Sequence, residues 1–184
     1  ALAGALAAAL AQMVAGLTVG KKKYAEAEAE MQRVLTQAQA LRRELVAAVA
    51  EDSAAFEAVM AAYRLPQGTE EEKARREAAI QHALAGAAAV PLRVARASIR
   101  ALELAQAVAE QGNTNTLTDA GSAAHMARAA VECAGLNVRT NAANMTDQET
   151  VRAWLAELAD LRRRAAELEA AVAQTVTERG HLPS

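Results

Sequence analysis

The sequence predicts an all-α protein, an up-and-down antiparallel bundle of about five long helices that forms one domain over residues 1–184. Apolar residues make up 53% of the chain and aromatic residues only 2%. Alanine supplies more than a quarter of the residues, and it favours helices over strands. A chain of 184 residues fits one domain. With so many small side chains, the helices must approach one another closely to exclude water.

The first two helices follow from helical periodicity and from the residues at their ends. The first helix covers residues 1–19 and ends near Gly20, because glycine is favoured just after a helix. The second runs from Tyr24 to Arg64 and stops before Pro66. In each helix, residues spaced three or four positions apart share one face, which we expect to be buried. These residues are Leu6, Leu10, Met13 and Leu17 in the first helix, and Val34, Ala38, Leu41, Leu45, Ala48, Asp52, Phe56, Val59 and Tyr63 in the second.

The other three helices begin at capping-box patterns, in which a threonine precedes an acidic residue by three positions. These pairs are Thr69 and Glu72, Thr116 and Asp119, and Thr146 and Glu149. The third helix ends near Gly112, and Pro91 is expected to kink or break it. The fourth helix ends near Arg139 and the fifth near Gly180.

The composition argues against several classes of function. Residues 1–19 are uncharged and precede three lysines, as a short membrane span or a signal peptide would be. Most of them are alanine, however, so a buried bundle helix is the favoured interpretation and no membrane partner is expected.

Nucleic-acid binding and metal binding are also not indicated. A net charge of −2 does not predict the basic surface that nucleic-acid binding requires. One cysteine, Cys133, and three scattered histidines show no metal-ligand spacing, and the single thiol suggests a reducing, cytoplasmic setting.

Apolar residues lie on several faces of the predicted helices. Leucine and alanine together exceed what the interior of one bundle can cover. We therefore expect helix faces to pair two copies of the chain as a homodimer, or to build a larger assembly.

Asp52 is the most informative single residue, because it occupies a core position in an otherwise apolar stripe. A buried carboxylate must be paired, hydrogen-bonded or protonated. Such groups occur at functional sites, but a structural ion pair with an arginine or lysine explains the pattern equally well.

Asparagines form the second group of candidates. Asn137 and Asn141 are one helical turn apart and share a face. Their amides suit an amide-edged heterocycle, whereas Asn113 precedes the fourth helix, where capping is the simpler role. A favourable interaction with the helix dipole explains the position of Asp119 in the first turn of the fourth helix. The same interaction explains Lys21 and Lys22 at the end of the first helix. These lysines could instead receive a carboxylate tail.

Several short motifs together resemble the cyclodeaminase/cyclohydrolase family. This family includes the C-terminal domain of formiminotransferase-cyclodeaminase and stand-alone methenyltetrahydrofolate cyclohydrolases. The motifs are EDSAAFEAVMAAYRLP at 51–66, VPL at 90–92, GN at 112–113, DAGSAA at 119–124 and NVRTN at 137–141. The resemblance extends over almost the whole chain.

The resemblance implies an all-α dimeric enzyme that acts on one-carbon tetrahydrofolates. The implied reactions are hydrolysis of 5,10-methenyltetrahydrofolate to 10-formyltetrahydrofolate, and cyclisation of 5-formiminotetrahydrofolate with release of ammonia. No metal, and no cofactor beyond the tetrahydrofolate substrate, is implied. Asp52 or Asp119 would act on the one-carbon unit. The pterin would meet the amides at 113, 137 and 141, and the glutamate tail would meet Lys21 or Lys22.

A non-enzymatic helical scaffold or interaction protein is the competing hypothesis, since an alanine-rich bundle needs no active site. The two hypotheses differ at Asp52. A scaffold has little reason to place a carboxylate on the core stripe without an adjacent cation.

Overall fold

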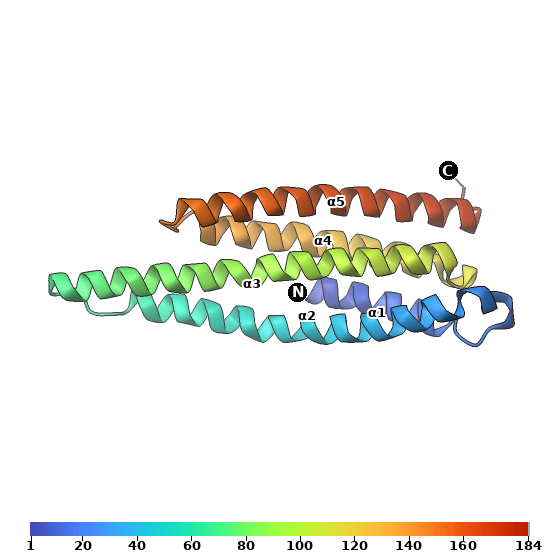
Figure 1. Ribbon diagram of the computed structural model, residues 1–184, viewed down its shortest axis with the longest axis horizontal. Helices are drawn as coiled ribbons and strands as arrows, with labels where there is room; N and C mark the ends of the chain where they lie inside the picture. Colours follow the sequence, from blue (N-terminus) through green and yellow to red (C-terminus); the bar gives the residue numbers. More distant parts are fainter. Residues whose placement is uncertain (184) are drawn as a thin grey trace.

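The computed structural model describes residues 1–183, which form five α-helices, two short 3₁₀ helices and no strand (Figure 1). The all-α class predicted from the alanine content is confirmed. The elements are α1 (Leu2–Gly16), η1 (Lys22–Ala27), α2 (Glu28–Tyr63), α3 (Glu70–Gln111), η2 (Thr114–Thr116), α4 (Leu117–Ala142) and α5 (Gln148–Gly180).

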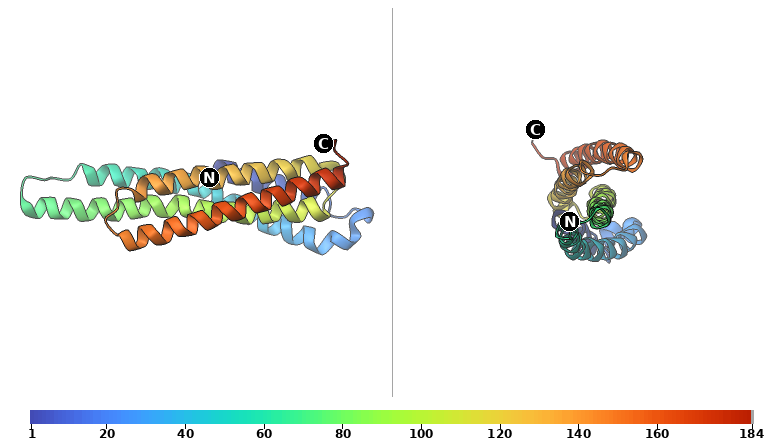
Figure 2. Two further views of the ribbon diagram at one scale, coloured as in Figure 1. Left: turned by 90° about the horizontal axis from the view of Figure 1, so that it is seen from above. Right: turned by 90° about the vertical axis from the view of Figure 1, so that its left-hand side faces the viewer.

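The helices lie side by side around α3, which contacts each of the other four. Seen end on, the remaining helices form a crescent with α3 in its hollow (Figure 2). The short helix α1 packs against α2, α3 and α4. The N-terminal ends of the chain and of α1 therefore lie at mid-length of the molecule, beside the middle of α2 (Figure 1).

The buried face of α1 consists of small residues, among them Ala7, Ala8 and Ala11. At Gly4 a Cβ atom would lie 2.9 Å from Ser98 Oγ of α3, so only glycine permits this approach. The prediction that Leu6, Met13 and Leu17 are buried is wrong, because these residues are exposed. A helix wedged among three others has room for alanine and glycine on its inner face, and its large side chains turn outward.

The buried stripe of α2 is interrupted after Ala48. Asp52, Phe56 and Tyr63 were predicted to be buried, but all three are exposed, and Phe56 is 64% accessible. Beyond Ala48 the buried side chains of α2 are Val59 and Ala62, which pack in a cluster with Ile80 and Leu84 of α3. The other faces of this part of α2, which carry Asp52 and Phe56, are exposed. The α2–α3 hairpin extends beyond that point (Figure 1).

Of the three predicted capping boxes, the first forms, the second does not, and the third is replaced by a cap one residue later. Thr69 and Glu72 form a reciprocal capping box at the start of α3, as predicted. Thr116 caps nothing, because its hydroxyl donates to the Asn113 carbonyl within the 3₁₀ turn before α4. At α5 the cap is Asp147, one residue later than expected, and its carboxylate accepts the Thr150 N–H at 3.1 Å.

Helix α3 continues through Pro91, so the predicted break does not occur. Proline has no N–H and cannot bond the carbonyl four residues earlier. That carbonyl belongs to Ala87, and it accepts a hydrogen bond from Asn141 Nδ2 of α4 at 3.0 Å instead.

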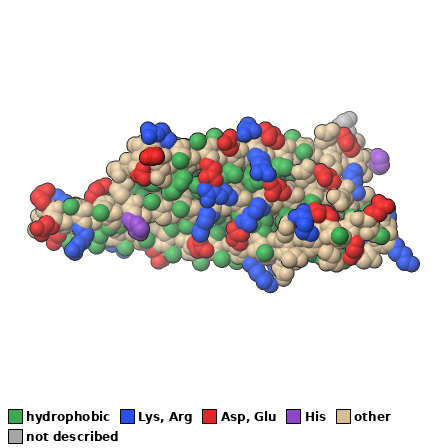
Figure 3. All heavy atoms as spheres, viewed as in Figure 1, with side chains coloured by type: hydrophobic (Ala, Val, Ile, Leu, Met, Phe, Trp, Pro, Cys, Tyr) green, Lys and Arg blue, Asp and Glu red, His purple; other side chains and the backbone are tan. Residues whose placement is uncertain are grey.

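Ion pairs join α3 to α2 on one side and to α5 on the other. Arg93 and Arg100 pair with Glu51 and Glu44 of α2, and Arg96 pairs with Glu157 of α5. Basic and acidic side chains lie close together along the middle of the face seen in Figure 3, among hydrophobic ones. The hydrogen bonds from Arg96 hold the pKa of Glu157 below its usual value.

Among the described residues, α3 alone is long and apolar enough to cross a membrane, and half of that stretch is buried against other helices. A core helix has the same composition. Helix α1, at 15 residues, is shorter than the roughly 20 residues that a span requires.

We predict that Gly112→Ala destabilises the fold by about 1–3 kcal/mol. A Cβ atom there would lie 2.4 Å from the Val108 carbonyl oxygen and 3.0 Å from Val14. Gly86→Ala is the matched control, because the space around Gly86 is open and alanine favours the helix interior. Urea unfolding of both variants checks the prediction. Equal stability of the two would contradict it.

Candidate functional site

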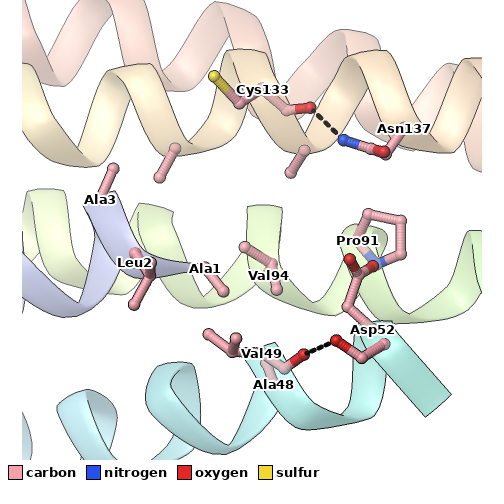
Figure 4. Close-up of a pocket in the computed structure, with 13 residues that line it drawn as sticks. Ala1, Leu2, Ala3, Ala48, Val49, Asp52, Pro91, Val94, Cys133 and Asn137 are labelled. Carbon is pink, nitrogen blue, oxygen red and sulfur yellow. Dashed lines mark hydrogen bonds between the residues drawn. The ribbon is translucent and has the colours of Figure 1, made fainter. Parts of the chain in front are cut away.

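A cavity of about 390 Å³ opens where the start of α1 meets the middle of α2, α3 and α4 (Figure 4). Its walls are mostly apolar, with Ala48 and Val49 from α2 and Val94 from α3. A few polar groups converge on it: Asp52 and Ser53 from α2, and Cys133 and Asn137 from α4. A largely apolar hollow with a few polar groups is the usual form of a small-molecule site.

Asp52 belongs to this cavity, although it is not buried as predicted. Its carboxylate extends from α2 toward Pro91 of α3 (Figure 4). It forms no ion pair and no side-chain hydrogen bond with any other described residue. The structural ion pair that the sequence left open is therefore absent from the described part of the chain, and the carboxylate oxygens are available to a ligand.

Asn137 and Asn141 share one face of α4, as predicted, and both lie near the cavity. Asn137 lines it, and its Nδ2 donates to the Cys133 carbonyl at 3.1 Å. This bond leaves Oδ1 as the free end of the amide. Asn141 lies one turn further on, half-buried, with its Nδ2 donating to Ala87 O and Asn137 O.

Asn113 lies at the other end of α1 and joins three segments there. Its backbone N–H donates to Thr18 Oγ1 at 2.9 Å, and its Nδ2 donates to the Leu17 carbonyl at 3.2 Å. Its Oδ1 accepts from the Asn115 N–H and from the Tyr24 hydroxyl. Hydrogen bonds from Thr114 lower the pKa of Tyr24. Asn113 thus fastens the end of α1 to the turn between α3 and α4.

Lys21, Lys22 and Asp119 also lie toward that end of the bundle. The two lysines flank a shallow hollow of about 270 Å³, and Asp119 is in the first turn of α4. At about 1.5 Å per residue, α1 separates the lysines from the Asp52 cavity by roughly 22 Å. By the same rise, Asp119 lies roughly 27 Å from Asn137 along α4. The predicted residues therefore form two groups: Asp52 and Asn137 line the cavity, with Asn141 one turn from Asn137, and the others lie toward the far end of α1.

The sequence reasoning missed three cavity residues. Cys133, considered in the sequence only as a metal ligand or a disulfide partner, is exposed at the cavity wall. A signal was present, since Cys133 is four residues before Asn137 and must share its face. Ser53 is adjacent to Asp52, and Pro91 was read only as a helix breaker. His125 is also exposed, and its Nδ1 lies 2.7 Å from Glu169 Oε1.

The sequence and the fold both match one family of known proteins. The sequence profile of the formiminotransferase-cyclodeaminase family matches residues 1–160, and the chain belongs to this family. The resemblance identified from the short motifs is thereby confirmed.

Individual relatives give a finer comparison. The chain is 46% identical to a methenyltetrahydrofolate cyclohydrolase from Methylorubrum extorquens over 96% of its own length and 85% of that protein. It is 36% identical over 143 residues to rat formimidoyltransferase-cyclodeaminase, of whose length it covers 26%. The crystal structure of formiminotetrahydrofolate cyclodeaminase from Thermotoga maritima superposes with a TM-score of 0.86 at 31% identity, over 96% of this chain and 84% of that one.

We predict that Asn113→Ala lowers the free energy of unfolding by about 1–3 kcal/mol, because it removes the Oδ1 and Nδ2 bonds that fasten α1. Asn115→Ala is the control, since Asn115 is exposed and its hydrogen bond in this turn uses the backbone N–H. Thermal unfolding measures the difference. An Asn113 variant with unchanged stability but weaker substrate binding would restore the ligand role expected from the sequence.

Proposed function

We propose that this chain hydrolyses 5,10-methenyltetrahydrofolate to 10-formyltetrahydrofolate, and that cyclisation of 5-formiminotetrahydrofolate with release of ammonia is a second activity of the same site. Family membership and the two named activities among its relatives support this proposal. The order of the activities follows the higher identity to the cyclohydrolase, at 46%, over nearly the whole chain.

The observation that carries the proposal is the unpaired Asp52 carboxylate at the wall of a mostly apolar cavity. The cavity, at about 390 Å³, lies in the range of pockets that hold small ligands. Methenyltetrahydrofolate carries its one-carbon bridge as a cationic amidinium. Because no described arginine or lysine forms an ion pair with this carboxylate, its negative charge can attract that cation.

Asp52 has two roles in the proposed hydrolysis. Its negative charge stabilises the amidinium as the substrate binds. It then accepts a proton from the water that adds to the bridging carbon, which gives a neutral tetrahedral intermediate. The proton on Asp52 then passes to the departing nitrogen as its C–N bond breaks. The hydroxyl of the intermediate releases its proton to water as it becomes the formyl C=O, and the formyl group stays on N10. In the cyclodeaminase direction, N10 attacks the formimino carbon and ammonia leaves from the corresponding intermediate.

Asn137 is the proposed partner of the pterin. Its Nδ2 is engaged with the Cys133 carbonyl, so Oδ1 is the end that can accept a hydrogen bond from the pterin edge. The reaction uses water, and we propose no cofactor beyond the folate itself.

The other predicted residues enter the proposal less directly. Asp119 lies too far along α4 to share the Asp52 cavity of the same chain, so Asp52 is our proposed proton acceptor. Lys21 and Lys22 lie on the opposite end of α1, where they could meet a glutamate tail only from an extended ligand or from the site of a second subunit.

We also propose a homodimer. Leu6, Met13 and Leu17, in and just after α1, are exposed, and α2 and α4, which pack against α1, also expose large apolar side chains: Val46, Val49, Met126 and Leu136. An apolar surface spread over three adjacent helices is typical of an association face. For the bundle itself, the short turns between consecutive helices favour the up-and-down order expected from the sequence.

We predict that Asp52→Asn lowers kcat for methenyl hydrolysis by about 10²–10⁴-fold, because the amide can neither accept the proton nor stabilise the cation. Loss of the methenyl chromophore measures the rate, with the formimino substrate assayed in parallel. Glu51→Gln is the control, because Glu51 is the adjacent acid but is paired with Arg93.

Wild-type turnover by a folded Asp52→Asn variant would remove Asp52 from the mechanism. A wild-type protein that turns over neither substrate, and that excess 5-formyltetrahydrofolate does not protect from heat, would favour the scaffold hypothesis instead.

We predict that Met13→Glu converts the dimer to a monomer, because it places a charge in the centre of the apolar face. Ala159→Glu on the exposed side of α5 is the control, and should leave the assembly unchanged. Light scattering coupled to size-exclusion chromatography gives the mass. A wild-type protein that is already monomeric would contradict the proposed dimer.

A further inference from the structure

Pro91 creates a local defect next to the cavity. In a regular helix the Ala87 carbonyl would accept the N–H of residue 91, which proline lacks. Ala87 is buried, with 7% of its surface accessible, so water is a poor substitute. A buried carbonyl without a partner costs free energy. Pro91 itself is buried and lines the cavity on the side that Asp52 approaches (Figure 4).

Asn141 of the neighbouring helix α4 supplies the hydrogen bond that the Ala87 carbonyl lacks. Its Nδ2 donates one hydrogen to the Ala87 carbonyl at 3.0 Å and the other to the Asn137 carbonyl at 3.1 Å. An amide nitrogen has two hydrogens, so both are used within the protein. A single side chain thus links the α3 turn that carries Pro91 to the α4 turn that carries Asn137.

The link sets the position of two cavity walls relative to each other. Pro91 and Asn137 face the cavity from α3 and α4, and Asp52 reaches toward them from α2 (Figure 4). The Asn137 amide is oriented in the same way, through its own bond to Cys133 O. The side-chain amides of Asn137 and Asn141 therefore lie one turn apart on α4, and the Asn141 amide is hydrogen-bonded to α3.

We infer that Asn141 is a positioning residue for the cavity rather than a ligand of the substrate. It takes the place of the helix hydrogen bond that Pro91 cannot make, and in doing so it holds Pro91 and Asn137 in register around Asp52. This role rests on the proposed function, because it is defined by the reaction at Asp52. The pairing of Asn141 with the proline defect can be tested without any substrate.

The test is a double-mutant cycle with Asn141→Leu and Pro91→Ala. Leucine removes both donors at similar size. Alanine at 91 restores the N–H, so the Ala87 carbonyl regains its partner within α3. We expect Asn141→Leu to lower Tm by about 2–8 °C in the wild-type background and by less than half as much in the Pro91→Ala background.

Kinetics separate positioning from binding. We expect Asn141→Leu to reduce kcat for methenyl hydrolysis by on the order of tenfold to a hundredfold, because small displacements of reacting groups are costly. KM should change by less than about threefold. The loss measured relative to Pro91→Ala alone should be much smaller, and a residue with only a general structural role would not show this rescue.

Three results would overturn the inference. The first is an equal loss of Tm for Asn141→Leu in both backgrounds. The second is a raised KM with unchanged kcat, which would make Asn141 a ligand of the substrate. The third is no turnover by the wild-type protein, which would overturn the proposed function and the positioning role together; the unfolding cycle would still show whether Asn141 and Pro91 are coupled. If Asn141→Leu does not fold, recovery of folding in the double variant supports the coupling, and continued failure contradicts it.

Discussion

The close approach of α1 to three other helices is the constraint on which the architecture depends. Most residues on its inner face are alanine, and at Gly4 a Cβ atom would lie 2.9 Å from Ser98 Oγ. This packing has two consequences. It brings the start of α1 to the middle of α2, where the cavity opens. It also turns the leucines and methionine of α1 outward, where they enlarge the exposed apolar surface.

The fold class was predictable because it depends on quantities that the sequence displays. Alanine content and three-to-four spacing give helices, and the signals at Thr69 and Gly112 give the ends of α3. The identity of the buried face was not predictable for α1. The usual rule places the largest apolar side chains inside, but the buried face of α1 is mostly alanine, and Leu6 and Met13 of the predicted stripe are exposed.

The candidate site was predictable in part. Asp52 and Asn137 were found because each is a polar residue in apolar surroundings, and both line the same cavity. The predicted burial of Asp52 was wrong, since helical spacing alone does not show which part of the α2 stripe is covered by neighbouring helices. Asn113 and Lys21 were grouped with them by family resemblance and residue type, which contain no information about distance. The length of α1 separates the two groups.

Pro91 and Asn141 show how a sequence defect can become a structural link. Read along the chain, a proline at the centre of a helix predicts a break, because the preceding turn loses a hydrogen bond. Read across the bundle, the same lost bond leaves an acceptor that a neighbouring side chain can reach, and the helix continues. The acceptor lies in the turn before Pro91, at the cavity wall. A donor from α4 can therefore satisfy it only by joining α3 and α4 at the point where they flank Asp52.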